Sequence, residues 1–366
     1  MFHNYRLKNV NVRLIIYVVI LTILGILVIG SANSGFQNKQ IIGMVLGLVI
    51  MSIVALIDYE YLLQFHWLYY ALIVGMLASV LIFGDDSHGA KRWIEIGIRF
   101  QPSELAKVLL VIFFAKYFMD HEDEINNFKR LFITAVLAGI PLLLIIKEPD
   151  LSTTIVTFLI IAIMLFASGL SYKITAWALG IAVGGSALIV SLILNGASVL
   201  SNYQAMRILA WLKPDDYPQS AYQQQNSIMA IGSGQFFGKG LYNTSVDSVK
   251  NGNYISEPQT DFIFAVVGEE LGFIGSVVIV ILLFLIVYEC IKVSKKAKDL
   301  TGQLICIGIA SLIAVQSFVN ICVDTGLFPN TGLPLPFVSY GLTSLVTMYI
   351  GIGFVLNVGL QAKRYS

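Results

Sequence analysis

Long apolar runs separated by short polar segments dominate the chain. A run of about 17 to 25 apolar residues is long enough for a helix to cross the hydrocarbon core of a bilayer. Ten runs of this kind lie near residues 14–30, 41–57, 66–83, 105–118, 130–147, 151–169, 173–194, 262–288, 303–323 and 340–360. The pattern predicts an all-α polytopic membrane protein in which residues 1–366 form a single membrane domain.

Two polar segments between these runs are long enough to carry more than a turn. One lies near residues 84–104, and the other, at 195–261, is a large loop between the seventh and eighth predicted spans. The second segment is rich in glycine, glutamine, tyrosine and asparagine. We expect it to be a partly ordered segment lying close to the membrane, not an independent domain.

Composition supports the membrane class and removes several alternatives. Hydrophobic residues make up 57% and charged residues 12% of the chain, and the mean hydropathy is +0.80. Ordinary soluble domains carry about a quarter charged residues. The net charge of +1 gives no indication of a nucleic-acid partner. The three cysteines, Cys290, Cys306 and Cys322, have no metal-site spacing, so no metal site is predicted.

The distribution of basic residues predicts the orientation. An even number of spans places both termini on one side, and that side carries twelve of the 23 lysines and arginines, against five in the opposite short loops. The other six lie in the fourth span or in the large loop. Because short cytoplasmic loops are enriched in lysine and arginine, we predict cytoplasmic termini, and both polar segments on the outer face.

The polar stretch before the eighth span has the highest density of candidate chemistry. Pro258 disfavours helix at the residue before it, and Thr260 is a good helix cap. This predicts Asp261 in the first turn of the helix, where the helix dipole favours a carboxylate. Glu257 and the pair at 269–270 add three acids nearby. A dipole-stabilising acid with interfacial glutamates explains the same residues.

Further polar groups gather at the predicted outer ends of other spans, where they are costly in lipid and therefore indicate function. Glu104 and Lys107, three residues apart, share one face of a helix that begins at residue 102 or 103. They could also be a simple ion pair. Asp150, in the sharp turn before the sixth span, could equally be a plain helix cap. The remaining clusters contain Arg92, Arg207, the glycine-rich turn 232–240 and the proline-stiffened segment 329–341 with Ser339.

Taken together, these motifs resemble the SEDS family (shape, elongation, division and sporulation), which includes the RodA and FtsW proteins. The resemblance covers essentially the whole chain. It rests on six motifs in fixed order: KRW at 91–93, FQPSELAK at 100–107, EPDLSTT at 148–154, AIGSGQFFGKG at 230–240, EPQTDFIFAVVGEELGF at 257–273 and TGLPLPFVSYG at 331–341. The last motif slightly favours the RodA branch. The family usually continues it with Gly-Ser-Ser, whereas Leu342, Thr343 and Ser344 follow here.

The resemblance implies a peptidoglycan glycosyltransferase of the bacterial cytoplasmic membrane. Such proteins polymerise glycan strands from lipid II, release polyprenyl pyrophosphate and work with a class B penicillin-binding protein and other elongation or division machinery. Asp261 matches the family's essential aspartate, Glu104 and Lys107 match the polar pair of one motif, and Asp150 matches the acid of another.

The chemistry that follows is an inverting displacement at the anomeric carbon. We predict Asp261 as the general base for the acceptor hydroxyl. Lys107, Arg92 and Arg207 are the candidates for the leaving pyrophosphate, and Glu257 and Ser339 are further candidates for substrate binding.

No cofactor is indicated, although a divalent cation, Mg or Mn, stays open. The alternative function is a transporter that flips lipid II, because charges within spans are also typical of transporters. Against it, the polar clusters lie at one face and no inverted repeat is evident. A third alternative is an inactive scaffold for a cell-wall synthase, which fits poorly with the intact acid cluster.

Overall fold

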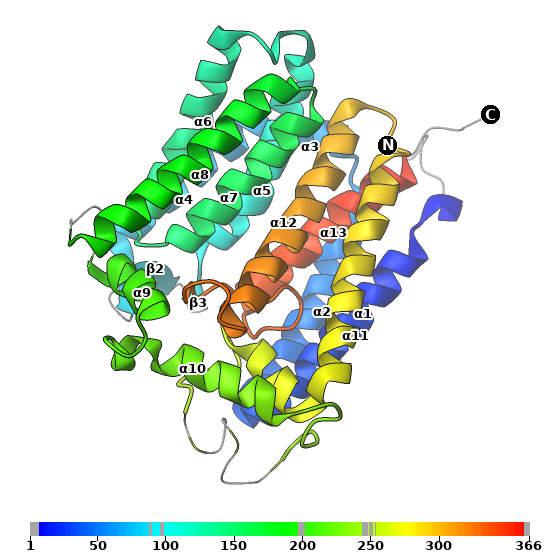
Figure 1. Cartoon of the computed structure of the whole chain (residues 1–366). Coiled ribbons are helices and arrows are strands. Elements are labelled where there is room, and N and C mark those ends of the chain that lie inside the picture. Colours follow the sequence, from blue (N-terminus) through cyan, green and yellow to red (C-terminus); the bar gives the residue numbers. More distant parts are fainter. Residues whose placement is uncertain are drawn as a thin grey trace.

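The protein is an all-α polytopic membrane protein with one small sheet. The computed structural model describes residues 7–87, 90–95, 99–196, 202–243, 248, 252 and 254–361. Ten helices coincide with the ten predicted ranges: α1 (Val12–Ala32), α2 (Ser34–Leu56), α4 (His66–Phe83), α5 (Pro102–Asp120), α6 (Phe128–Lys147), α7 (Leu151–Ala167), α8 (Tyr172–Leu194), α11 (Ile263–Ser294), α12 (Leu300–Asp324) and α13 (Leu342–Leu360). They run side by side as a bundle (Figure 1).

Eight of these ten helices are long and apolar enough to cross a membrane by length and composition alone, among the residues described. The other two differ for visible reasons. Helix α7 spans only 17 residues. Helix α5 begins with Pro102 at its first turn, as predicted, and carries Glu104 and Lys107 inside the bundle. Helices shorter or more polar than a typical span are tolerated here because neighbouring helices cover their polar groups.

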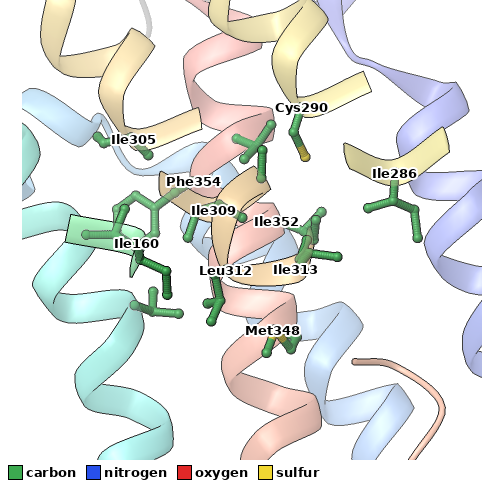
Figure 2. Close-up of a cluster of buried hydrophobic side chains, with 14 of the residues drawn as sticks. Ile160, Ile286, Cys290, Ile305, Ile309, Leu312, Ile313, Met348, Ile352 and Phe354 are labelled. Atoms are coloured by element: carbon green, nitrogen blue, oxygen red, sulfur yellow. The ribbon is translucent and has the colours of Figure 1, made fainter. Parts of the chain in front are cut away.

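Helix α12 forms the centre of the bundle. It packs against α5, α7, α11 and α13, while α13 packs along α2 and α1 packs along α11. Figure 2 shows Ile309 and Leu312 of α12 between Ile160 of α7 and Ile352 of α13. All four side chains are buried in one apolar cluster. Since lipid tails are as apolar as these side chains, close packing holds the helices together more than transfer from water does.

Both polar segments contain regular structure that the sequence reasoning did not predict. The segment near 84–104 forms three antiparallel strands, β1 (Asp85–Ser87), β2 (Ala90–Glu95) and β3 (Arg99–Phe100). The large loop contains α9 (Asn202–Leu212) and α10 (Pro218–Ser233), which lie across the end of the bundle opposite the start of α1 and the end of α13 (Figure 1). Residues 197–201, 244–247, 249–251 and 253 of the predicted loop lie outside the described residues. The remaining short helices are η1 (Leu7–Asn9), α3 (Tyr59–Leu63) and η2 (Glu122–Glu124).

The glycine-rich turn at 232–240 approaches the backbone of α11 at a break in that helix. At Gly272 the backbone has φ 65° and ψ −161°, which interrupts the helical hydrogen bonds. Lys239 N and Gly240 N donate to the carbonyl oxygens of residues 269 and 270, both at 2.9 Å, and Phe273 N donates to Gln235 O, also at 2.9 Å. The turn therefore satisfies the backbone groups that the break leaves free, as buried backbone requires.

Candidate active site

Asp261 lies in the turn that leads into α11, and three hydrogen bonds fix the backbone around it. Asn320 Nδ2 donates to Asp261 O at 2.8 Å, Ser339 Oγ donates to Thr260 O at 2.6 Å, and Tyr340 N donates to Gln259 O at 2.8 Å. Helix α11 begins only at residue 263. The prediction that Thr260 caps this helix is therefore wrong: the Thr260 hydroxyl donates to Glu257 O at 2.8 Å and closes a turn of its own.

Burial and four nearby charges set the ionisation of Asp261. The pKa of its carboxyl is raised from 3.8 to about 6: burial is the largest cause, and the charges of Glu257 and Asp150 add to the rise, while Arg207 and Arg92 oppose it. A carboxyl with a pKa near 6 is a base at neutral pH and holds a proton more strongly than an ordinary aspartate. The fold thus brings together five of the predicted site residues from four separate segments.

Gly332 lies beside both Asp261 and Arg207. A Cβ at this position would lie 3.1 Å from Asp261 Oδ2 and 3.8 Å from Arg207 Nη1. The backbone at Gly332 has φ +74°, a conformation that other residues rarely adopt. Glycine here allows the guanidinium and the carboxylate to lie against the same stretch of backbone.

Asp261 opens into a cavity of about 560 Å³ between the spanning helices and the loop before α13. This volume is within the range of about 300–1,000 Å³ that small-molecule sites occupy. Its lining includes Lys39, Trp93, Glu104, Glu257, Asp261 and Tyr340. The residues that depart from the family motif, at 342–344, also line it. The cavity combines acidic groups, one exposed cation and aromatic walls.

Glu104 and Lys107 form a buried ion pair beside this cavity, and each residue is 1% exposed. Lys107 Nζ lies 2.7 Å from Glu104 Oε1 and 2.6 Å from Gln316 Oε1, and Gln316 Nε2 donates to Pro334 O at 2.9 Å. Lys107 is therefore engaged by two partners and is not among the residues lining the cavity. Its position favours a role in holding α5, α12 and the loop before α13 together, with only Glu104 reaching the cavity.

The turn between α6 and α7 positions Asp150, Arg92 and Glu148. Asp150 does cap α7, since its Oδ1 accepts from Thr153 N at 3.0 Å, and its Oδ2 also lies 3.8 Å from Arg92 Nε. Glu148 is fully buried, and neither of its carboxyl oxygens has a hydrogen-bond partner among the described residues. Burial and Asp150 raise the pKa of Glu148 to about 8, opposed by Arg92. Glu148 is therefore protonated at neutral pH.

Ser339 is close to Asp261, but its hydroxyl is fully used by the protein. Its Oγ accepts from Leu335 N at 2.7 Å and donates to Thr260 O, and the residue is 5% exposed. The serine joins the loop before α13 to the turn that carries Asp261. This geometry favours a positioning role over the substrate contact that we predicted for it.

Two predicted acids lie away from the site. Glu269 pairs with Lys239 at 2.8 Å, and Glu270 accepts from Ser31 at 2.7 Å, so both fasten the glycine-rich turn and α1 to α11. They follow Asp261 in the sequence, but neither lines the cavity at Asp261. The glycine-rich turn approaches the backbone of α11.

Helix α12 carries a polar stripe that was not predicted from the sequence. Gln316, Asn320 and Asp324 are spaced four residues apart, so they share one face of the helix. Gln316 binds Lys107, Asn320 holds the backbone of Asp261, and Asp324 is fully buried beside α10, where Ser227 Oγ donates to its carbonyl oxygen at 2.8 Å. Three polar residues at this spacing inside an apolar run are the signal that could have identified the stripe.

The described residues contain no group of three or more histidine, cysteine, aspartate or glutamate side chains suited to hold a metal ion. The acids around Asp261 are accompanied by Arg207 and Arg92, which occupy the same region with positive charge. Whether a divalent cation takes part stays open, as the sequence left it.

Comparison with known proteins assigns the family. A family model described as "Cell cycle protein", of the FtsW, RodA and SpoVE proteins, matches residues 10–364. The chain belongs to this family. It is 33% identical to the probable peptidoglycan glycosyltransferase FtsW of Trichlorobacter lovleyi, over 98% of this chain and 95% of the relative. It is 32% identical to the peptidoglycan glycosyltransferase MrdB of Escherichia coli, over 98% of this chain and 95% of MrdB.

Another family member is the stage V sporulation protein E of Bacillus subtilis, 33% identical over 97% of both chains. Because FtsW, MrdB and sporulation relatives share nearly the same identity with this chain, the slight preference for the RodA branch stays a prediction. The fold agrees with solved members. A chain of a peptidoglycan synthase complex that coordinates polymerization and crosslinking superposes with a TM-score of 0.80 and 26% sequence identity. The match covers 96% of this chain and 97% of the other. The RodA protein of Thermus thermophilus superposes with a TM-score of 0.72 and 25% sequence identity, over 97% of this chain and 98% of RodA.

Proposed function

We propose that this chain polymerises the glycan strands of peptidoglycan from lipid II, with Asp261 as the general base. The observation that carries the proposal is a carboxyl with a pKa of about 6 that opens into a cavity at the end of a membrane bundle. Family membership supplies the reaction class, because relatives that cover nearly the whole chain are named peptidoglycan glycosyltransferases. The enzyme is thus a bacterial membrane glycosyltransferase.

The reaction can be written on the residues present. The Asp261 carboxylate takes the proton of the acceptor sugar hydroxyl, whose oxygen forms a bond to the anomeric carbon of the donor. The bond between that carbon and the pyrophosphate oxygen breaks, and polyprenyl pyrophosphate leaves with inversion. Arg207 and Arg92 do not line the cavity, but their charges act on Asp261, so we expect the same positive charge to act on the leaving group. Fixed charges aimed at developing negative charge stabilise a transition state without reorganisation.

The cavity geometry refines which predicted residues would touch substrate. Glu104 and Glu257 line the cavity with Asp261. Lys39, which the sequence reasoning did not include, contributes a cation to the same lining and is itself exposed. Lys39 therefore replaces the buried Lys107 as a candidate for contacting the pyrophosphate.

The decisive experiment is glycan-strand formation from purified lipid II by the reconstituted protein. We expect Asp261→Asn and Asp261→Ala to reduce the polymerisation rate by about 10²- to 10⁴-fold, the usual contribution of a general base. Asp216→Asn is the matched control, because Asp216 is an exposed acid between α9 and α10. Polymerisation by Asp261→Asn at the wild-type rate would remove Asp261 from the mechanism. Lipid II flipping without polymer from the wild type would replace the polymerase with the transporter.

The partner and the orientation are part of the proposal. One structural neighbour belongs to a complex that coordinates polymerization with crosslinking. This supports a partnership with a class B penicillin-binding protein, which would supply the transpeptidase. From the distribution of basic residues we place the protein in the bacterial inner membrane, with both termini on the cytoplasmic side and Asp261 on the outer face.

A further inference from the structure

A second cavity, of about 540 Å³, lies at the opposite end of the bundle from Asp261. The end of α11, the start of α1 and Gly359 of α13 form it. Asp261 precedes α11 and Glu289 lies near the end of that helix, so at 1.5 Å per residue the two sites are roughly 40 Å apart. This cavity has no part in the proposed polymerisation.

The cavity is strongly basic. Four cations line it, against a single carboxylate from Glu289; the cations are Lys8, Arg13, Lys292 and Lys296. Lys292 Nζ lies 3.4 Å from Glu289 Oε1. Within the part of the chain that the structure describes, the other three cations form no ion pair. Uncompensated like charges around one concave site repel each other, and a bound anion relieves that repulsion.

The buried carboxylate organises this site. Glu289 is 4% exposed, and its Oε2 accepts from Asn11 Nδ2 at 2.7 Å. Asn11 Oδ1 in turn caps α1 by accepting from Leu14 N at 3.1 Å. Glu289 therefore fixes the start of α1, so that Val12 and Arg13 line the cavity. Gly359 contributes the floor, where a Cβ would lie 3.5 Å from Val293 Cγ1 and 3.7 Å from Asn9 O.

Apolar side chains exposed on the same two helices place the cavity at the level of the membrane surface. Val12 lines the cavity and is 56% exposed, and Ile16 lies one turn further into α1 at 48%. On α11, Tyr288 and Ile291 flank the basic residues at 52% and 40% exposed. Exposed apolar groups on membrane helices contact acyl chains, so a ligand here would have an anionic head beside an apolar surface.

We propose that this cavity binds the phosphate of an anionic phospholipid headgroup. The basic side chains and the start of α1 would hold the phosphodiester oxygens, and the acyl chains would lie along Val12, Ile16 and Ile291. Basic pockets between membrane helices are suited to such headgroups. The volume is sufficient for a glycerophosphate group, within the range of about 300–1,000 Å³ for small-molecule sites.

The test is competitive lipid binding by the purified full chain, measured by native mass spectrometry with equimolar phosphatidylglycerol and phosphatidylcholine. We expect the wild type to retain phosphatidylglycerol preferentially. Arg13→Gln with Lys296→Gln should lower that preference by about tenfold or more, since each basic residue attracts anionic lipid. These two side chains form no ion pair with the described residues, so the fold should persist, and thermal unfolding checks it. Lys8→Gln with Lys296→Gln is the second variant if the first unfolds.

The matched control is Lys129→Gln with Lys173→Gln, two exposed lysines at the same end of the bundle on α6 and α8. The control should keep the wild-type preference. An unchanged preference in the folded pocket variant, or an equal loss in pocket and control variants, would overturn the proposal. Displacement of the lipid by millimolar inorganic phosphate would also overturn it, because the site would then take a free phosphate-bearing anion.

Discussion

At the scale of single residues, the environment of Asp261 differs from that of an ordinary helix-capping acid. It precedes α11 and takes no part in its cap, and burial outweighs Arg207 and Arg92 in setting its pKa. The same carboxyl in the first turn of an exposed helix would have a lowered pKa. A raised pKa fits a group that accepts a proton during the reaction and returns it afterwards.

This environment predicts the acid side of the pH profile of polymerisation. Because only the ionised carboxyl can act as base, kcat/KM should fall as the pH drops through about 6, the pKa of Asp261, by about tenfold per unit below it. An ordinary aspartate would keep its activity to about pH 4. The measurement is polymerisation from lipid II across this range. An activity that is level from pH 7 to 4.5 would contradict the assignment.

Glu148 predicts a different pH effect, on stability. Its pKa is 4.5 in an ordinary setting and about 8 in the fold, so between these values the folded chain holds a proton that the unfolded chain has lost. The free energy of unfolding should therefore fall as the pH rises through this window, by at most about 1.4 kcal/mol per unit. Glu148→Gln should remove this contribution. Thermal unfolding of both proteins from pH 5 to 8 tests it, and parallel curves would show that Glu148 is ionised throughout.

At the scale of elements, the break in α11 and the glycine-rich turn depend on each other. Gly238 has φ +79°, and a Cβ there would meet Glu270 O at 2.2 Å. Gly240 has φ +91°, but no atom lies within 4 Å of the corresponding position. Both glycines therefore have a left-handed backbone conformation, but only Gly238 lies too close to the backbone of α11 for a Cβ to fit.

This pair separates backbone strain from contact. Gly240→Ala should destabilise the protein by about 1–2 kcal/mol, the cost of a left-handed backbone. Gly238→Ala should cost a further 1–3 kcal/mol or so, because the glycine-rich turn and α11 must move apart. The two thermal unfolding temperatures give the comparison. Equal loss of stability in both variants would mean that the turn does not hold the break in α11.

At the scale of the whole molecule, the bundle separates two chemical ends. The Asp261 cavity lies at the end covered by α9 and α10, and the basic cavity lies at the end where α1 begins and α13 ends (Figure 1). The three native cysteines are buried, so we expect little labelling of the chain before a cysteine is introduced.

Cysteine accessibility in intact cells therefore tests the orientation. Ser220→Cys, exposed in the first turn of α10, should react fully with a membrane-impermeant maleimide, whereas Lys173→Cys, exposed at the start of α8, should stay unlabelled until the cells are broken. The unmodified chain provides the blank. The reverse pattern would place Asp261 in the cytoplasm and remove the outer-face assignment.

The sequence by itself determined the class of the protein and the places of its ten long helices, and it predicted Asp261 as the central acid. In a bilayer every backbone polar group must be paired within the segment, so a long apolar run has to become a helix, and its position can be read directly. The runs near 105–118 and 262–288 correspond to the longer helices Pro102–Asp120 and Ile263–Ser294. Polar motifs at the ends of such runs are costly, and this cost marked Asp261 and Glu104 as candidates.

Only the tertiary structure decided which of these groups meet. Arg207 and Asp150 lie dozens of residues before Asp261, yet the packing of α7, α9 and α12 brings their charges to it. Because of this packing Lys107, Glu269 and Glu270 do not line the cavity, whereas Lys39 does. Contacts of this range depend on how helices cross and on which polar groups remain to be paired after packing. Hydrophobic periodicity sets neither, because it fixes where each helix lies in the chain and not which helices become its neighbours.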